Sequence, residues 1–563
     1  MQPPAQTRSA RLSQAPQLAQ LHSLPCSFGR HCAPHIDQHR ARQADPHGGC
    51  TLRHAHLERR LSTMHAVAEA QQMAPEVFPV SRQLQQPGTD QQQINVVMKF
   101  GGSSVADADR MWEVAQIMCS FPHLFPCVVL SAMGKTTNLL LQAGAEALTT
   151  HPGNVAALAP LRDIKELHRQ AAQDLHVDKE TKAEMEQLLS ELQQLLVGVS
   201  IMQDLTMRAK DSLVSFGERL STRLFAAFLR KEGVAARQYD AWDLGMVSSD
   251  DFTNADVRYE QSFANIRTSL TRTNGGPQEI PIVTGFLARG ESTGAITTLG
   301  RGGSDLSATV IGAALGLAEV QVWKDVDGVL TSDPRLVQGA RPVPLLTYDE
   351  ATELAFFGAT VLHPQAMQPA FQQQFHAGHK LAVRVKNSYN RAAAGTLISE
   401  ERDMRDALMT SIVLKPGITL LDIVSTRMLG QVGFMATVFD IFNSNGISVD
   451  VVATSEVSIS LTLDPSKMWS RDLVDAELDA LVSAFKAKGI ARVSYKRAMS
   501  CVSLICNVEK TSQILERVFK VLGREGINVK MMSQGASKNN ISLIVSDDEG
   551  KNAVRSLHEE FFD

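Results

Sequence analysis

The stretch Ile94-Asn-Val-Val-Met-Lys-Phe-Gly-Gly-Ser-Ser104 decides the fold of this chain. Its first half is a short apolar run of the kind that forms a buried strand, and two glycines follow it directly. Glycine lets backbone N–H groups approach phosphate oxygens closely, and Lys99 could neutralise the charge of a transferring phosphoryl group. The alternative is a tight strand-to-helix turn with a surface lysine. Because a lysine inside a buried strand ahead of Gly101 and Gly102 is uncommon, we favour a phosphate-binding turn.

Further apolar strands alternate with helical segments as far as residue 400. Residues 155–232 are mostly helical, since apolar side chains recur at helical spacing and few Gly or Pro interrupt them. This alternation predicts an α/β fold with a mostly parallel sheet covered by helices on both faces. Ligands bind such sheets at the carboxyl ends of the strands. The predicted strands are residues 94–100, 126–131, 280–286, 295–299 and 320–323.

A second candidate anion site is Arg301-Gly-Gly-Ser-Asp305, which follows a predicted strand and precedes an apolar helix. The N-terminus of a helix presents free N–H groups that favour anions. Arg301 could hold a carboxylate through two hydrogen bonds. Ser304 or Asp305 could instead be an ordinary N-cap, but a cap alone does not need Arg-Gly-Gly before it.

Other polar segments carry weaker signals. Met133-Gly-Lys-Thr-Thr137 resembles the end of a P-loop, but the first glycine of that motif would fall at Val129, so we reject this interpretation. Residues 323–328 by themselves indicate a polar turn. Glu218 lies away from the apolar stripe of its helix, so periodicity predicts an exposed side chain.

Residues 411–563 contain an internal repeat. Phe439–Val449 aligns with Phe519–Val529, and each copy predicts a helix, a glycine stop, a strand, a turn and a second strand. Gly446 and Gly526 would supply the positive φ of helix C-caps. Two copies are too few for a solenoid, so we expect a pair of small α/β sandwiches packed together.

The first ninety residues have a different composition. Residues 1–60 hold eight Arg and three acidic residues, and the first lysine of the chain is Lys99. An Arg-rich, acid-poor start is typical of an organelle transit peptide, and an untargeted disordered tail is the alternative. Pattern alone does not separate plastid from mitochondrion.

The composition of the whole chain excludes several classes of protein. Its 563 residues allow about three or four domains, and 44% of them are hydrophobic. There is no apolar run of 18 residues, so we expect no membrane span. The net charge of −5 argues against a nucleic-acid partner. Seven Cys without a CxxC pair argue against a disulfide scaffold and a zinc site.

Several segments, in chain order, resemble the signatures of aspartokinases, and the resemblance covers residues 95–563. Any one of them alone would be weak, but together they are highly specific. They are Lys99–Ser104, Ser215–Thr222, Gly300–Asp305, Val322–Gly328 with Thr331–Arg335, and Phe357–Pro364.

The resemblance implies an amino-acid-kinase fold, similar to carbamate kinase, over residues 94–400, preceded by a leader over residues 1–93. It implies two ferredoxin-like βαββαβ ACT domains at 411–490 and 495–563, with the first inserted into the second. The implied activity is phosphorylation of the β-carboxylate of L-aspartate by ATP, with Mg²⁺ carried by the nucleotide. The product, 4-phospho-L-aspartate, starts the routes to lysine, threonine, methionine and isoleucine. A plastid enzyme, a homodimer joined through its ACT domains and no fused homoserine dehydrogenase are also implied.

Roles follow residue by residue from the resemblance. Lys99 is implied to stabilise the transferring phosphoryl group, and Asp305 to organise that lysine. Aspartate is implied to bind at Thr137, Glu218, Arg301, Gly302, Gly303 and Ser304. ATP is implied to bind at Lys99, Gly101, Gly102, Ser103, Lys324, Asp325, Leu330 and Arg335.

Two positions depart from the family pattern. Thr360 stands where many members have Lys, which removes one cationic nucleotide contact. Leu330 stands where Tyr is common near the adenine, so we expect aliphatic packing there.

The tail resembles the lysine-inhibited branch, so L-lysine is the expected inhibitor, and S-adenosylmethionine as a second effector is left open. Asp450 and Glu456 could meet the two ammonium groups of lysine, and ordinary surface acids are the alternative. The matching residues are Met428, Gly433, Phe434, Ser448, Val449, Asp450, Thr454, Ser455 and Glu456.

Two other functions compete with this one. A kinase of the same fold could act on glutamate or uridylate, but Arg301 and Glu218 suit an amino-acid substrate better than a nucleotide. The chain could also be an inactive amino-acid sensor, but the retention of Lys99, Glu218, Arg301 and Asp305 argues against it.

Overall fold

The structure, a computed structural model, describes residues 93–271, 279–357, 362–373, 380–405, 407–425, 432–463, 475–535 and 537–563. Residues 1–92 of the predicted leader, Thr360 and Met428 lie outside these ranges. Within them, no helix is both long and apolar enough to cross a membrane.

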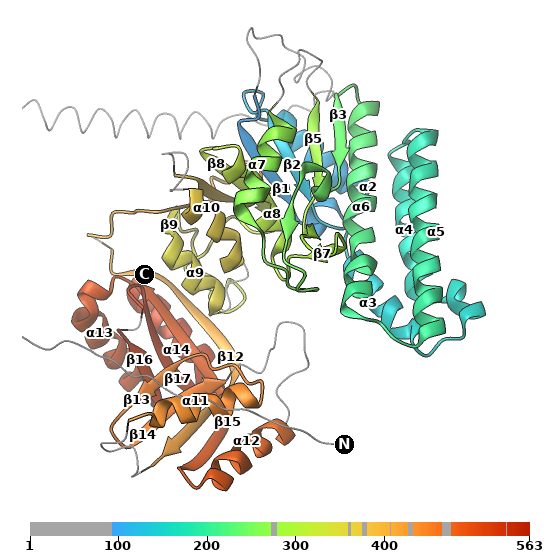
Figure 1. Ribbon diagram of the computed structural model, residues 1–563. Coiled ribbons are helices and arrows are strands. Elements are labelled where there is room, and N and C mark those ends of the chain that lie inside the picture. The colour runs from blue at the N-terminus through green and yellow to red at the C-terminus, as the bar shows by residue number, and fades with distance from the viewer. Residues whose placement is uncertain are drawn as a thin grey trace, which may run out of the picture. The chain divides into compact units, whose positions relative to one another are not determined.

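An eight-stranded sheet forms the centre of the first part of the described chain (Figure 1). Its strand order is β3-β5-β2-β1-β8-β10-β11-β9, and every neighbouring pair except β10–β11 is parallel. The residues of β1, β2 and β5 are all buried, as expected for parallel strands covered on both faces. The predicted α/β class is therefore confirmed. The strands are β1 (Val96–Phe100), β2 (Pro126–Leu130), β3 (Ala236–Tyr239), β5 (Ile280–Thr284), β8 (Glu319–Lys324), β9 (Leu345–Thr347), β10 (Ala382–Asn387) and β11 (Thr396–Ser399).

Alternation of side chains along β1 assigns its two faces to different helices. Met98 and Phe100 pack with side chains of α2 and α6, whereas Val97 packs with those of α7 and α8. Because successive side chains of a strand point to opposite faces, Lys99 lies on the α8 face with Val97. The helices of this part are α2 (Ala108–Cys119), α3 (Thr136–Ala147), α4 (Ala159–Asp174), α5 (Lys179–Met202), α6 (Met207–Lys231), α7 (Tyr259–Leu270), α8 (Gly303–Ala314), α9 (Tyr348–Phe356) and α10 (Gln368–Gln373).

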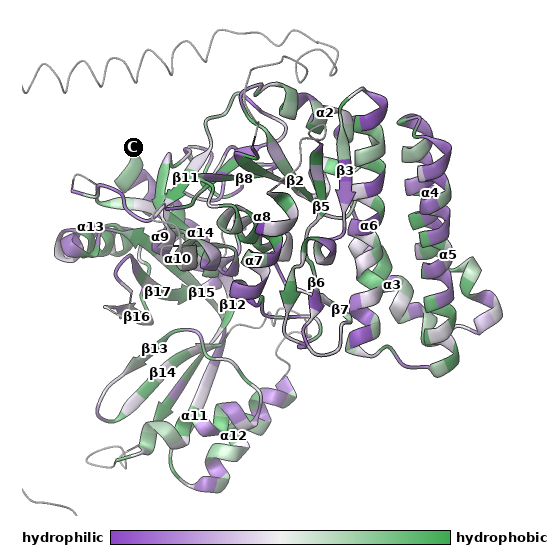
Figure 2. Cartoon of the chain, turned by 45° about the horizontal axis from the view of Figure 1, so that its top comes forward, coloured by the Kyte–Doolittle hydropathy of each residue, from purple (hydrophilic) through white to green (hydrophobic). Residues whose placement is uncertain are grey.

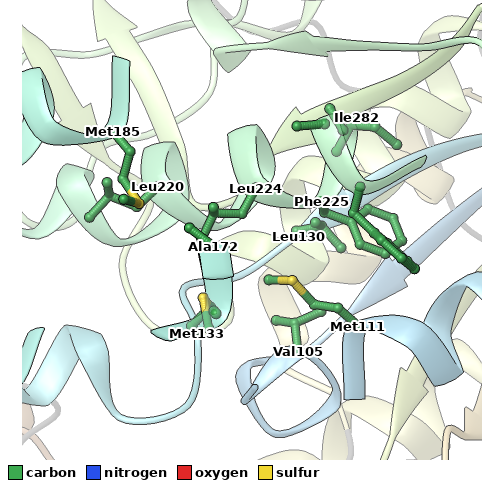
Figure 3. Close-up of a cluster of buried hydrophobic side chains, with 14 of the residues drawn as sticks. Val105, Met111, Leu130, Met133, Ala172, Met185, Leu220, Leu224, Phe225 and Ile282 are labelled. Atoms are coloured by element: carbon green, nitrogen blue, oxygen red, sulfur yellow. The ribbon is translucent and has the colours of Figure 1, made fainter. Parts of the chain in front are cut away.

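Helix α6 is covered on several sides. It contacts β3 and β5 of the sheet and also α4 and α5. Leu224 and Phe225 of α6 lie in one apolar cluster with Leu130 of β2 and Ile282 of β5 (Figure 3). The hydropathy colouring agrees, since β2 and β5 are hydrophobic while α4 carries much polar colour (Figure 2). An α6 side chain can therefore be buried even when it lies off the main apolar stripe.

The strand predicted at 295–299 does not join the main sheet. It is β7 (Ile296–Thr298), and it forms a separate three-stranded sheet with β6 (Leu287–Gly290) and β4 (Val247–Ser248). The predicted strand at 280–286 ends early at Thr284, and the chain turns at Phe286, whose φ is +70°. β6 and β7 then pair as an antiparallel hairpin, so the expectation of a simple strand–helix alternation was wrong here.

The C-terminal part is built on one six-stranded sheet with the order β13-β14-β12-β15-β17-β16. The long strands β12 (Met409–Val424) and β15 (Arg492–Cys506) are antiparallel neighbours and serve both copies of the repeat. The first copy runs from the second half of β12 to the first half of β15, so it is inserted into the second, as expected. The other elements are α11 (Phe434–Ser444), β13 (Val452–Thr454), β14 (Ser458–Leu463), α12 (Asp475–Lys488), α13 (Thr511–Arg524), β16 (Met531–Gln534), β17 (Asn540–Ser546) and α14 (Asp547–Phe562).

The repeat behaves as its sequence predicts. Gly446 follows α11 with a φ of +62°, and Gly526 follows α13 with a φ of +70°. Each copy has its own apolar core, one around Val438 and Phe442 and the other around Val518 and Leu522.

Candidate active site

The ammonium group of Lys99 lies at the carboxyl end of β1, against the first turn of α8. Its Nζ is 2.6 Å from Oδ1 of Asp305, and the two side chains are only 8% and 5% exposed. Lys99 reaches this position because it is on the α8 face of β1, and Asp305 is the third residue of α8. The two residues expected to be catalytic are therefore in direct contact.

A second lysine meets the same carboxylate. Lys324 ends β8, the parallel neighbour of β1, and its Nζ is 3.2 Å from Oδ2 of Asp305. Burial alone would raise the pKa of Asp305, but Lys324 and Lys99 outweigh it and lower the pKa to about 2. Burial lowers the pKa of Lys99, and Asp305 opposes that shift. Two ammonium groups around one carboxylate leave the site with an excess of positive charge that suits an anion.

The predicted phosphate-binding turn lies beside Lys99. It forms the short 3-10 helix η2 (Gly102–Val105), which packs on the turn that follows β2. A Cβ on Gly102 would lie 2.8 Å from the carbonyl oxygen of Ala132, so a larger residue would push the two turns apart. The backbone N–H of Gly134 donates to the carbonyl of Gly102 at 3.0 Å. The backbone of residues 101–103 is thus fixed next to an ammonium group.

Glu218 is buried, so the prediction of an exposed side chain was wrong. Gly217 allows α6 to approach the turn after β2, because a Cβ there would lie 2.6 Å from the Cβ of Ala132. One oxygen of Glu218 accepts a hydrogen bond from Ala132 N at 3.2 Å, while Oε2 is buried and has no hydrogen-bond partner among the described residues. Burial raises the pKa of Glu218 to about 8, against smaller opposing effects of Ala132 N–H and Lys99. A buried carboxylate oxygen without a donor is suited to an ammonium group from a ligand.

The N-terminus of α8 faces the same region. Ser304 is 9% exposed, and its hydroxyl accepts a hydrogen bond from Ser131 Oγ at 3.1 Å. Gly302 is the N-cap with a φ of +74°, and Gly303 is the buried first residue of the helix. Arg301 stands just before them with its side chain exposed to solvent. The arrangement offers helix N–H groups and a guanidinium to a carboxylate.

Ser131 was missed in the sequence. It follows β2 directly, and its carbonyl accepts from Ser221 Oγ of α6 at 2.8 Å. It therefore links α6 to Ser304 and the start of α8. The rule that ligands bind at strand ends would have singled it out, because it is the first polar residue after a buried strand.

The remaining predicted site residues come from α3 and from the chain that follows β8. Thr137 is half-buried in the first turn of α3, and Asp325 is exposed just after β8. Leu330 is half-buried, and its carbonyl accepts from Ser411 Oγ at 3.0 Å. Arg335 is exposed, and its guanidinium binds Asp333 at 2.7 Å. Their described contacts are with other residues than Lys99.

The residues expected to bind lysine fall into two groups along the first ACT copy. Gly433 and Phe434 begin α11, and Ser448, Val449 and Asp450 follow that helix. The backbone N–H of Asp450 donates to Thr462 O, and that of Ser455 donates to Ser458 O at the tip of the β13–β14 hairpin. Thr454, Ser455 and Glu456 are exposed at this tip.

Asp450 and Glu456 lie at opposite ends of β13, since Asp450 precedes that strand and Glu456 follows it. That these two carboxylates meet the two ammonium groups of lysine stays a prediction.

Comparison with known proteins places this geometry in a family. Residues 95–384 match the amino acid kinase family, and residues 421–469 and 502–561 match the ACT domain. Aspartokinase 1, chloroplastic, from Arabidopsis thaliana is 55% identical over 474 residues, which cover 84% of this chain and 81% of the relative. Lysine-sensitive aspartokinase 3 of Escherichia coli K12 is 35% identical, and the match covers 83% of this chain and 99% of that relative.

Solved structures are similar over the same region. Escherichia coli aspartokinase III in complex with aspartate and ADP (R-state) superposes with a TM-score of 0.70 at 33% identity, covering 83% of this chain and 100% of that one. The same enzyme in complex with lysine and aspartate (T-state) gives a TM-score of 0.68 at 32% identity, covering 84% and 100%.

Proposed function

The chain belongs to the aspartokinase family and is an aspartate kinase, and we propose that the residues around Lys99 carry out its reaction. In that reaction the γ-phosphoryl group of ATP passes to the β-carboxylate of L-aspartate, giving ADP and 4-phospho-L-aspartate. The observation that carries the assignment is the pair of lysines that share Asp305 at 2.6 and 3.2 Å. Phosphoryl transfer needs positioning and charge neutralisation more than covalent chemistry, and this cluster supplies both.

In the proposed mechanism Lys99 neutralises charge that develops on the transferring phosphoryl group. Asp305 acts as the residue that holds Lys99 and Lys324, since both of its oxygens are engaged and its pKa of about 2 keeps it ionised. The backbone of Gly101, Gly102 and Ser103 binds the phosphates from the other side. Asp305 is not a general base, because so acidic a group is a poor proton acceptor at neutral pH.

Aspartate binds, in this proposal, between α6 and the N-terminus of α8. The unpartnered Oε2 of Glu218 accepts the substrate ammonium group. Arg301, together with the N-terminal residues Gly302, Gly303 and Ser304, holds a carboxylate, and Thr137 supplies a further polar contact.

The nucleotide binds, in this proposal, along Lys324, Asp325, Leu330 and Arg335. Arg335 would have to exchange Asp333 for a phosphate. Within the described ranges, no group of three or more His, Cys, Asp and Glu side chains could hold a metal. In this proposal Mg²⁺ is carried by the phosphates of ATP, since Mg²⁺ is usually bound by one or two carboxylates, substrate phosphates and water. When bound, the ion would neutralise phosphate charge.

We also propose that L-lysine inhibits the enzyme through the first ACT copy. Support comes from the match of this region to the ACT domain and from the similarity to the lysine-bound aspartokinase III structure. Because Asp450 precedes β13 and Glu456 follows it, we propose that each end of the β13–β14 hairpin forms part of a site that a second copy completes. This agrees with a homodimer joined through ACT domains.

Asp450 has a partner that bears on this regulation. Nζ of Lys415 on β12 is 3.0 Å from Oδ2 of Asp450, and the side chains are 14% and 11% exposed. The same ammonium group lies 5.0 Å from the ring of Phe356, the last residue of α9. We propose that the ammonium of an inhibitor lysine competes with Lys415 for this carboxylate, which would change the contact with α9.

The leader, in this proposal, directs the protein to plastids. The Arg-rich composition of residues 1–60 and the chloroplastic names of the relatives that are about 55% identical support it. A fluorescent reporter fused to residues 1–93 should enter plastids, and a reporter that stays in the cytosol would contradict the proposal.

The function is tested by measuring ADP release with different acceptors. L-aspartate should stimulate release strongly, whereas L-glutamate and uridylate should not. Stimulation by glutamate or uridylate, with none by aspartate, would favour a kinase of that other acceptor; no stimulation by any of them would favour an inactive sensor.

A further inference from the structure

Ser388 lies where the two proposed phosphate-binding elements meet. It directly follows β10, which is the parallel neighbour of β8, and Asn387 is level with Lys324 in that pair. The backbone N–H of Ser388 donates to the carbonyl of Lys324 at 2.7 Å, and its hydroxyl donates to the same carbonyl at 3.0 Å. Two hydrogen bonds therefore fix Ser388 to the backbone that carries Lys324.

The hydroxyl of Ser388 also reaches the phosphate-binding turn. Its oxygen is 2.8 Å from Oγ of Ser104, a residue of η2 that is fully buried. A serine has one O–H to donate, and that of Ser388 goes to Lys324. With the Ser388 O–H directed at Lys324, Ser104 acts as the donor of this hydrogen bond.

Arg110 of α2 is the third residue that contacts the Ser388 hydroxyl. Its Nη2 donates to the hydroxyl and to the carbonyl of Ser388, each at 3.2 Å. The hydroxyl thus gives one hydrogen bond and accepts two, which is its full capacity. A weaker link runs in parallel, since Arg110 stacks 3.6 Å from the centre of the Tyr389 ring and the Tyr389 hydroxyl donates to Ser103 O at 3.2 Å.

We infer that Ser388 is a positioning residue that sets the distance between the phosphate-binding turn and Lys324. Its described contacts are with Ser104, Arg110 and Lys324, so it acts through them rather than on the reacting atoms. The inference rests on the proposed ATP site, because it assumes that residues 101–103 and Lys324 bind the same nucleotide. Loss of the hydroxyl should loosen ATP binding and leave aspartate binding almost unchanged.

The test is steady-state kinetics of Ser388→Ala in the full chain, with both substrates varied. The KM for ATP should rise about tenfold, which is the size expected when a buried hydroxyl loses its partner. The KM for aspartate should change less than about twofold. Ser104→Ala removes the same contact from the other side and should give the same pattern, and it serves as the readout if Ser388→Ala does not fold. The KM for ATP of the double variant should be no higher than that of Ser388→Ala alone, because the two side chains share one interaction.

Ser262→Ala is the matched control. Ser262 is also fully buried, and its hydroxyl bonds at 3.0 and 3.1 Å to the backbone of Val247, a residue with no role in the proposed site. It should lower the melting temperature without changing either KM. The inference is overturned if Ser388→Ala and Ser104→Ala behave like this control, or if they raise both KM values equally. Lys99→Met distinguishes failure of this inference from failure of the proposed function. Its turnover tests the proposed active site independently of Ser388.

Discussion

Lys99 and Lys324, from two neighbouring parallel strands, hold the two oxygens of a single carboxylate, that of Asp305, at 2.6 and 3.2 Å. The carboxylate fixes both ammonium groups at the same edge of the sheet before any substrate arrives. Preorganised charge of this kind stabilises a transition state because little has to move when the reaction occurs.

Replacement of Lys99 by methionine should abolish most turnover. The loss of one preorganised charge at a transition state typically lowers kcat about 100-fold or more. The KM for aspartate should change little, since Lys99 acts on the phosphoryl group. Lys386→Met is the matched control, because Lys386 is also buried in the sheet but lies beside Trp323 and Phe121 instead of Asp305. Normal kcat in Lys99→Met would refute the assignment.

Arg301→Ala should raise the KM for aspartate more than that for ATP. A lost charged hydrogen bond to a carboxylate costs about 1.5–3 kcal/mol, or roughly a factor of 10 to 150. Arg301→Lys should recover only part of the affinity, because an ammonium group does not bind a carboxylate through a planar fork. An effect confined to ATP would show that the two subsites have been exchanged.

Glu218 should make aspartate binding depend on pH. Its pKa of about 8 leaves it largely protonated at about pH 6.5, so the KM for aspartate should fall as the pH rises to about 8.5 and more carboxylate forms. Glu218→Gln should bind aspartate poorly and lose this dependence. If the variant keeps the wild-type pH profile, another group is responsible.

The same group should affect stability with the opposite trend. The pKa of Glu218 is raised from 4.5, so the folded chain keeps a proton that the unfolded chain releases between about pH 4.5 and 8. Stability contributed by this residue is therefore lost as the pH rises through that range. In unfolding experiments without ligand, Glu218→Gln should be more stable than the wild type at about pH 8.5 and nearly equal to it at about pH 4.5. Equal stability at both values would contradict the burial of an ionisable carboxyl group.

Lys415→Met should tighten lysine binding about tenfold in calorimetry, because the ammonium group of Lys415 no longer competes for Asp450. Asp450→Asn should weaken binding. Lys496→Met is the control. Lys496 is a largely exposed lysine of the same sheet whose Nζ is 4.0 Å from Oδ2 of Asp422, a different carboxylate from that of Asp450. If Lys415→Met binds lysine as the wild type does, the competition is absent. If neither the wild type nor any of these variants binds lysine, the assignment of lysine as the inhibitor fails.

Much of the site follows from local rules, and the rest depends on tertiary contacts. Period-two alternation in β1 puts Lys99 on the face opposite Met98, but only the packed structure shows that α8 covers this face. Glu218 was wrongly predicted to be exposed because an apolar stripe identifies only one buried face of a helix. In the structure α6 packs against the sheet, α4 and α5 at once. The position of Asp450 and Glu456 at opposite ends of β13 depends on the pairing of β13 with β14, a contact that spacing in the sequence does not reveal.

The most direct test of the account traps the product of the reaction. The purified chain is incubated with MgATP, hydroxylamine and either L-aspartate or L-glutamate, and the hydroxamate is quantified. Aspartyl hydroxamate should form with the wild type and Lys386→Met, glutamyl hydroxamate should not form, and Lys99→Met should form almost none. No aspartyl hydroxamate from the wild type, or an undiminished amount from Lys99→Met, would contradict the central claim.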